Sequence, residues 1–168
     1  MTATDMIATG TADKDHVDAD GGPWMLHATL VARGGTGVLL RGPSASGKSD
    51  LGLRLIDRGA LLVADDQVRL RVEEGRLIGS APAALRGLIE VRGLGILSLP
   101  VEDHATVALV IDLDMAARIP RLPTRDRLML HGIGVPRLRL NAFEASTPIK
   151  IELALADPAA IGREGRHD

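Results

Sequence analysis

The sequence predicts an α/β fold in which a core sheet is joined by additional antiparallel hairpins. Residues 60–64 and 105–113 are almost continuously apolar, as expected of strands that a sheet buries on both faces. Residues 48–58 instead place apolar side chains at helical spacing. Turn residues such as Gly34-Gly35 and Glu74-Gly75 separate further β-rich runs, which is typical of hairpins.

Each element follows from its local pattern. In order, we expect strands over residues 25–32 and 36–40, a helix over 48–58, a strand over 60–64, a hairpin over 67–72 and 76–78, a strand over 105–113, a strand pair over 128–130 and 135–140, and a helix over 149–156. Gly59 fits the glycine that ends a helix. Thr147 is expected to cap the last helix, with Pro148 in its first turn.

The chain has 168 residues, a length that fits one domain. Residues 1–22 are rich in Thr, Ala, Gly and Asp without apolar periodicity, which indicates a disordered acidic tail. Residues 24–160 form the expected compact domain, and residues 161–168 are expected to be frayed.

Composition excludes several classes of function. The chain has no cysteine and a net charge of −2, so we expect no disulfide scaffold, no thiolate zinc site and no nucleic-acid partner. Trp24 and Phe143 are its only aromatic residues, which argues against base-stacking nucleic-acid modules. No apolar run approaches the ~20 residues of a membrane span, and we expect a soluble, cytoplasmic protein.

The strongest functional motif lies between the second predicted strand and the first predicted helix. It fits the phosphate-binding loop G-x-x-x-x-G-K-[ST] in full, with the residues Gly42, Pro43, Ser44, Ala45, Ser46, Gly47, Lys48 and Ser49. Glycines let backbone N–H groups surround phosphate oxygens, and the helix N-terminus adds partial positive charge. Lys48 is expected to reach the phosphates of a nucleotide, and Ser49 to bind Mg²⁺.

A phosphate loop of this kind works with a carboxylate at a strand end. Asp65-Asp66 follows the apolar strand directly, and Asp112 ends the strand over 105–113. We favour the pair, because one carboxylate could hold metal-bound water while the other takes a proton from an acceptor hydroxyl. A plain hairpin turn would also account for the pair, and Asp112 fits a solvated strand end. His27, taken alone, is typical of a structural histidine.

Four stretches in this order resemble the catalytic domain of HPr kinase/phosphorylase, the bacterial enzyme that phosphorylates a serine of the phosphocarrier protein HPr. They are Leu26-His27, the phosphate loop with Asp50 after it, Leu-Val-Ala-Asp-Asp at residues 62–66, and Ile-Glu-Val-Arg-Gly-Leu-Gly-Ile-Leu at residues 89–97. The match spans residues 25–156. It implies an α/β fold of the HPr kinase and PEP carboxykinase type, with ATP and Mg²⁺ as cofactors and HPr as partner.

The resemblance also implies roles for single residues. Lys48 would bind phosphates, with Ser49 and Glu90 as Mg²⁺ ligands. Asp65 is favoured as the proton acceptor with Asp66 in support, although the order within the pair stays open. His27 would lie beside that aspartate and tune its charge. Arg92 and a second arginine, Arg121 or alternatively Arg118, would stabilise the charge of the phosphoryl group.

The chain departs from the family pattern in three places. Ala45-Ser46 replaces a Gly-x pair in the phosphate loop, and Asp50 replaces a glutamate. Residues 140–146 lack the basic residues that longer members carry there, and they include Glu144. Since that basic loop is linked to phosphorolysis of phospho-HPr, we expect the kinase activity to be kept and this reverse activity to be weak, altered or absent. The length suggests a stand-alone catalytic core.

Two other readings stay open from the sequence. One is a kinase for a nucleoside or another metabolite, although no arginine-rich lid segment is apparent. The other is a nucleotide-sensing module without catalysis that regulates a partner such as a sensor kinase. The sequence does not determine the oligomeric state; longer family members form hexamers, and a homo-oligomer is compatible with the chain.

Overall fold

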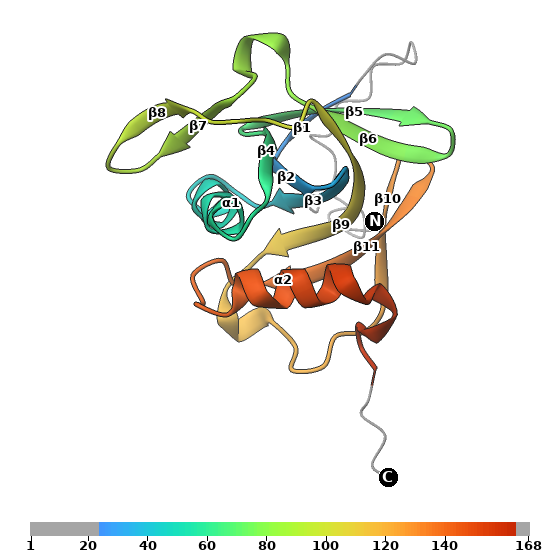
Figure 1. The fold of residues 1–168 in the computed structure, drawn as a ribbon. Coiled ribbons are helices and arrows are strands. Elements are labelled where there is room, and N and C mark those ends of the chain that lie inside the picture. The colour runs from blue at the N-terminus through green and yellow to red at the C-terminus, as the bar shows by residue number, and fades with distance from the viewer. Residues whose placement is uncertain (1–23, 164–168) are drawn as a thin grey trace, which may run out of the picture.

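The computed structural model describes residues 24–163 and shows a strongly curled sheet with two helices (Figure 1). The strands are β1 (Trp24–His27), β2 (Thr29–Arg33), β3 (Thr36–Arg41), β4 (Leu61–Ala64), β5 (Gln67–Glu73), β6 (Arg76–Ser80), β7 (Leu88–Val91), β8 (Gly95–Ser98), β9 (His104–Leu113), β10 (Asp126–Leu130) and β11 (Ile133–Leu140). The helices are α1 (Lys48–Asp57) and α2 (Thr147–Ala156), and the short 3₁₀ turns are η2 (Ala83–Leu85), η3 (Ala116–Arg118) and η4 (Pro158–Ala160).

The main sheet has nine strands, with the order β1-β5-β6-β9-β3-β2-β4, and β9 also pairs with β11, which pairs with β10. The pairings of β9 with β3 and with β11 are parallel, whereas the other pairs in this sheet are antiparallel. The predicted class, an α/β fold with added hairpins, is therefore confirmed. The parallel strands β3, β9 and β11 lie at the centre of the sheet, and β3 leads directly into the phosphate loop.

Two apolar cores lie on opposite faces of the curled sheet, because neighbouring residues of a strand point to opposite sides. Leu30 and Leu39 pack inside the curl, whereas the adjacent Val31 and Leu40 pack beneath the helices. The first core also contains Leu26, Val63, Val68, Leu70, Leu77, Val107 and Val110. The second includes Leu51, Leu55, Leu109, Ile111, Leu138 and Ile151. Both cores are almost wholly aliphatic, as the scarcity of aromatic residues requires.

The two helices begin at different kinds of cap. Gly47 precedes α1, and Leu51 and Leu55 bury its inner face, as the apolar spacing predicts. In α2 the cap position belongs to Ser146, so the expectation that Thr147 is the N-cap is wrong by one residue. Thr147 is buried and its hydroxyl donates to the carbonyl of Asn141, because the incoming loop turns back on itself there.

Two further segments differ from the predicted elements. The β-rich run 25–32 is divided at Ala28, whose N–H donates to the carbonyl of Asp66, so β1 and β2 pair with different strands. Residues 88–98 form a separate two-stranded hairpin, β7–β8, which projects from the body of the molecule near α1 (Figure 1).

The tail predicted over residues 1–22 lies outside the described residues, as do residues 164–168. Ile161 packs against the core beneath the helices, so the folded part reaches at least that residue. Among residues 24–163, no helix is long and apolar enough to cross a membrane.

Packing of α2 onto the sheet makes a direct stability prediction. Ile151 is fully buried, whereas Ile149, on the same helix, is 45% exposed. We expect Ile151→Ala to lower the free energy of unfolding by about 2–5 kcal/mol, because it leaves a cavity. The matched variant Ile149→Ala should cost less than about 1 kcal/mol. Chemical denaturation measures both, and equal losses would contradict this packing of α2.

Candidate active site

The phosphate loop, residues 42–49, connects the end of β3 to the start of α1. Gly47 has a φ of 93°, a left-handed conformation that favours glycine. A Cβ atom at this position would also lie 2.8 Å from the Cβ of Ala142. The loop therefore requires glycine here for two reasons, and it brings the N-terminus of α1 close to the segment that precedes α2.

Lys48 is buried, and its ammonium group lies on the loop itself. Its Nζ donates hydrogen bonds to the carbonyls of Gly42 (2.6 Å) and Pro43 (2.9 Å). Burial lowers the pKa of the Lys48 ammonium, an effect that the negative charges of Asp65 and Asp66 oppose. The structure thus confines a cation at the mouth of the loop, where the phosphate groups of a nucleotide would bind.

Ala45 adopts a φ of 63° in the same loop. This left-handed conformation is unfavourable for any residue with a Cβ atom, by about 1–2 kcal/mol. The position is the one at which the family pattern has glycine. In this chain the loop therefore places a residue with a Cβ atom in a conformation that favours glycine.

Asp65 is buried at the end of β4 and accepts hydrogen bonds from three elements. Its Oδ1 accepts from the hydroxyls of Thr29 in β2 and Ser49 in α1, each at 2.8 Å. Its Oδ2 accepts from the backbone N–H of Glu90 in β7 at 3.3 Å. A buried carboxylate needs such partners, and these three hold the phosphate loop, the sheet and the β7–β8 hairpin together.

Asp66 points elsewhere. Its backbone is left-handed, with a φ of 68°, and its side chain is 66% exposed. Its Oδ1 lies 3.1 Å from Nε2 of His27. The histidine therefore lies beside Asp66, whereas the resemblance placed it beside the favoured Asp65. The two contiguous carboxylates have separate environments, one buried and bonded, the other open to solvent.

The β7–β8 hairpin supplies the opposite wall of the site. Glu90 and Arg92 are exposed and border the same hollow as His27 and Asp66. This hollow has a volume of about 510 Å³ and reaches from the phosphate loop to the hairpin. Its lining residues are His27, Thr29, Ser44, Ala45, Gly47, Lys48, Ser49, Asp50, Leu53, Asp65, Asp66, Glu90, Val91, Arg92 and Phe143.

Most residues predicted for the site thus line one hollow. Gly42, Pro43 and Ser46 of the phosphate loop do not line it, and neither does the predicted second arginine. Arg121 and Arg118 follow the end of β9, and neither borders the hollow. Arg118 lies 3.7 Å from Asp114. Asp112, the other candidate carboxylate, forms ion pairs with Arg41 at 2.8 Å and with Arg137 at 3.6 Å. Arg92 is therefore the arginine that the structure brings to the site.

Three residues of the hollow carried no functional expectation from the sequence. Thr29 is fully buried in β2, and only its bond to Asp65 reveals a role. Leu53 belongs to α1, one turn beyond Ser49. Phe143 borders the phosphate loop although it lies in a loop far along the chain. In the sequence, the only signal for any of the three was that Phe143 is one of two aromatic residues.

The donor set fits Mg²⁺. Among the described residues, no three histidine or acidic side chains form a group that could hold a metal ion alone. Magnesium needs fewer protein ligands, since it binds through one or two carboxylates together with waters and substrate phosphates. The Ser49 hydroxyl and the Asp65 carboxylate meet at 2.8 Å, and Glu90 lies across the same hollow. These hard oxygen ligands would hold Mg²⁺ together with a nucleotide.

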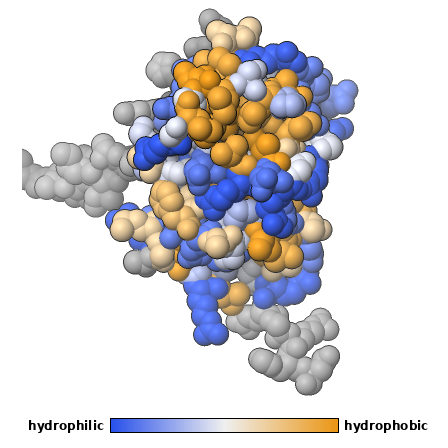
Figure 2. All heavy atoms as spheres, turned by 60° about the vertical axis from the view of Figure 1, so that its left-hand side comes forward, coloured by the Kyte–Doolittle hydropathy of each residue, from blue (hydrophilic) through white to orange (hydrophobic). Residues whose placement is uncertain are grey.

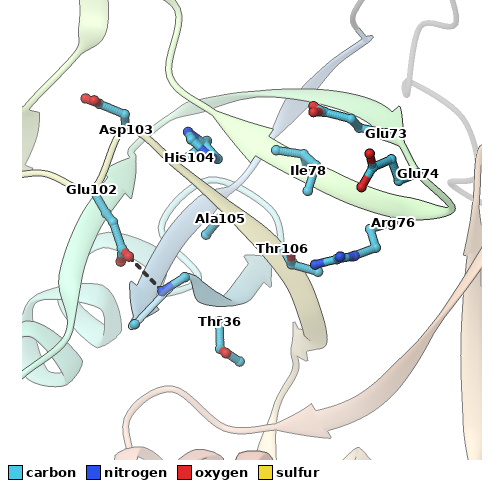
Figure 3. Close-up of a pocket in the computed structure, with 12 residues that line it drawn as sticks. Thr36, Glu73, Glu74, Arg76, Ile78, Glu102, Asp103, His104, Ala105 and Thr106 are labelled. Atoms are coloured by element: carbon cyan, nitrogen blue, oxygen red, sulfur yellow. Dashed lines mark hydrogen bonds between the residues drawn. The ribbon is translucent and has the colours of Figure 1, made fainter.

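A larger hollow, of about 730 Å³, lies around the β2–β3 and β5–β6 turns (Figure 3). Two of its carboxylates make structural contacts: Glu102 accepts from the N–H of Gly35 at 2.7 Å, and Asp103 pairs with Arg86. The Glu102 contact is the dashed line in Figure 3. This hollow contains none of the phosphate-loop residues, so the smaller hollow is the candidate active site.

The strained phosphate loop makes a second stability prediction. Because Ala45 is exposed, Ala45→Gly should remove backbone strain without loss of packing. Glycine also raises the entropy of the unfolded chain, so the net rise in the free energy of unfolding should be about 0.5–1 kcal/mol. Ala84→Gly, at an exposed position in η2 with ordinary backbone angles, should instead destabilise. Thermal and denaturant unfolding compare them; a destabilising Ala45→Gly would contradict the strain.

Comparisons with known proteins agree with this geometry. The family profile of the HPr Serine kinase C-terminal domain matches residues 23–145. The HPr kinase/phosphorylase of Clostridium tetani is 46% identical over 96 residues, which cover 53% of this chain and 32% of that protein. That of Caldicellulosiruptor bescii is 42% identical over 124 residues, covering 67% and 40%. The chain thus spans well under half the length of these curated relatives.

A solved structure shows the same fold. The HPr(Ser) kinase/phosphatase from Coxiella burnetii superposes with a TM-score of 0.72 at 32% sequence identity, covering 80% of this chain and 90% of the other. The matched region includes the phosphate loop, the Asp65-Asp66 pair and the β7–β8 hairpin within the profile limits. The chain belongs to the HPr serine kinase C-terminal domain family.

Proposed function

We propose that the protein is an ATP- and Mg²⁺-dependent kinase that transfers the γ-phosphoryl group to a serine of HPr. The observation that carries the proposal is the exposed Asp66–His27 pair, in the same hollow as Lys48 of the phosphate loop. Relatives that carry this domain are named HPr kinase/phosphorylase. Phosphate binding and a proton acceptor are the two functions that phosphoryl transfer to a hydroxyl requires.

The nucleotide would bind through the phosphate loop and α1. Backbone N–H groups of residues 42–49 and the ammonium of Lys48 would contact its phosphates, with Nζ exchanging its bonds to Gly42 and Pro43 for phosphate oxygens. Ser49, Asp65 and Glu90 would hold Mg²⁺. The bound metal neutralises negative charge on the transferred group.

Asp66 is the better candidate for the proton acceptor. The serine oxygen attacks the γ-phosphorus, the bond from that phosphorus to the ADP oxygen breaks, and the serine proton passes to a carboxylate oxygen. Asp65 already accepts three hydrogen bonds and is buried, whereas Asp66 is open to an incoming hydroxyl. His27 would hold the Asp66 carboxylate in place. This reverses the order favoured from the sequence.

The surface beside the hollow favours a protein acceptor over a metabolite. Leu94 and Ile96 of the β7–β8 segment are 74% and 70% exposed. Apolar residues gather over this hairpin, above a band of hydrophilic residues (Figure 2). Exposed apolar patches mark interaction surfaces, and this one adjoins the proposed catalytic residues. A small metabolite would not need it, whereas HPr could dock there with its serine over Asp66.

The adjacent aspartates allow a paired test. Asp66→Asn should lower phosphoryl transfer from γ-labelled ATP to HPr at least 100-fold, because the proton acceptor is lost, and leave the Kd for Mg²⁺·ATP unchanged. Asp65→Asn should weaken binding of Mg²⁺·ATP and lower stability, since it disturbs the bonds to Ser49 and Thr29.

His27→Ala serves as an intermediate variant and should lower the transfer rate less than Asp66→Asn. Calorimetry gives the binding constants and the labelled assay gives the rates. Two results together would assign the role of proton acceptor to Asp65. They are full transfer by Asp66→Asn, and loss of transfer with intact nucleotide binding in Asp65→Asn.

We further propose that phosphorolysis of phospho-HPr is weak. The segment 140–146 lies beside the phosphate loop and carries no Arg or Lys. Glu144 forms an ion pair with Lys150 at 2.8 Å, so its negative charge is partly compensated. The proposal therefore depends on the missing basic residues, which would otherwise attract inorganic phosphate, more than on repulsion by Glu144.

Incubation of phospho-HPr with Mg²⁺ and inorganic phosphate measures this directly. We expect pyrophosphate release at least tenfold slower than the forward transfer under matched conditions. Glu144→Arg should accelerate the release, because a cation attracts the attacking phosphate, whereas Glu73→Arg, in the distant β5–β6 hairpin, should not. Rapid pyrophosphate release by the unaltered protein would refute the proposal.

A further inference from the structure

The segment before α2 holds an aromatic ring in solvent. Phe143 is one of the two aromatic residues of the chain and is 70% exposed. The other, Trp24, stacks on His131 and is partly buried against the core inside the curl. An exposed phenyl ring in a chain with an almost wholly aliphatic interior serves no packing purpose that the fold requires.

The backbone on both sides of this ring is tied to α1. The guanidinium of Arg54 donates to the carbonyls of Ala142 and of Glu144 (3.3 Å), directly before and after Phe143. Arg54 is itself oriented by Asp50, with Nε to Oδ2 at 3.1 Å. The helix that begins at the phosphate loop thus holds the backbone on both sides of the ring.

A second set of bonds closes the turn. The N–H of Phe143 donates to Oδ1 of Asn141 at 3.0 Å, and the Thr147 hydroxyl donates to the carbonyl of Asn141. The ring is therefore presented by an ordered turn, and holding it in place requires little further loss of conformational entropy when a ligand binds.

The ring faces the candidate active site. A Cβ atom at Gly47 would lie 3.2 Å from Cε1 and Cζ of Phe143, so the ring edge lies close beside the phosphate loop. Phe143 borders the same hollow as Ser49, Asp50 and Leu53. It lies next to the start of α1, where the phosphates of a nucleotide would be held. The ribose and base of that nucleotide would therefore lie near the ring.

We propose that Phe143 is the platform on which the nucleotide base stacks. A nucleotide held by its phosphates must place its base on some nearby surface, and every base has a flat face that stacks on an aromatic ring. Apart from His27, which lies against Asp66, the other side chains that line the hollow are charged, small or aliphatic, so Phe143 is the apolar flat surface beside the start of α1. This inference rests on the proposed nucleotide site.

The test compares ligands with and without a base. Calorimetric Kd values are measured for Mg²⁺·ATP and for Mg²⁺·tripolyphosphate. Phe143→Ala should weaken ATP binding about 5- to 10-fold, the lower end of the range for one base-stacking contact, and leave tripolyphosphate binding unchanged. Phe143→Trp should retain ATP binding, and ATP but not tripolyphosphate should change its fluorescence. Ile149→Ala, another exposed apolar residue outside the hollow, is the matched control.

Three results with the variants would overturn the inference. Equal loss of both ligands would mean that the ring only supports the loop, and unchanged ATP binding would remove its role. A raised KM for HPr with unchanged ATP affinity would assign the ring to the acceptor protein. Wild-type protein that binds both ligands but does not phosphorylate HPr would defeat the proposed function while leaving the stacking result valid. Binding of neither ligand would overturn both.

Discussion

The carboxylate of Asp65 bonds to the hydroxyls of Thr29 and Ser49 and to the N–H of Glu90, and so joins β2, α1 and β7 at one buried point. A buried acceptor of this kind is tolerated only when its partners are in place. The phosphate loop, the sheet and the projecting hairpin therefore hold their relative positions together. The hollow between them exists because this one group fixes three of its walls.

The next residue, Asp66, lies in a different environment because the chain turns between the two. Asp66 has a left-handed backbone and directs its carboxylate outward to His27, so contiguous aspartates face different surroundings. One stays bonded within the protein and the other remains available to an acceptor hydroxyl. The turn that carries Phe143 is held in a similar way, because Arg54 of α1 bonds to the backbone on both sides of it.

Local patterns were enough to predict the phosphate loop, α1, the β5–β6 hairpin and the apolar strands, because each depends on neighbouring residues. They were not enough for contacts made by distant strands. His27 lies beside Asp66 because β1 pairs with β5, where it faces Gln67, and no local pattern encodes that register. Arg121 was assigned to the site only because its order along the chain fits the family pattern. Phe143 is held at the site by bonds from Arg54, which lies about 90 residues earlier in the chain.

The most direct measurement of the central claim is transfer of labelled γ-phosphate from ATP by the unaltered protein to purified HPr, compared with HPr whose acceptor serine is changed to alanine. We expect Mg²⁺-dependent labelling of HPr and none of the alanine variant. Tight binding of Mg²⁺·ATP without labelling of HPr would contradict it and would favour a nucleotide-sensing role for the same site.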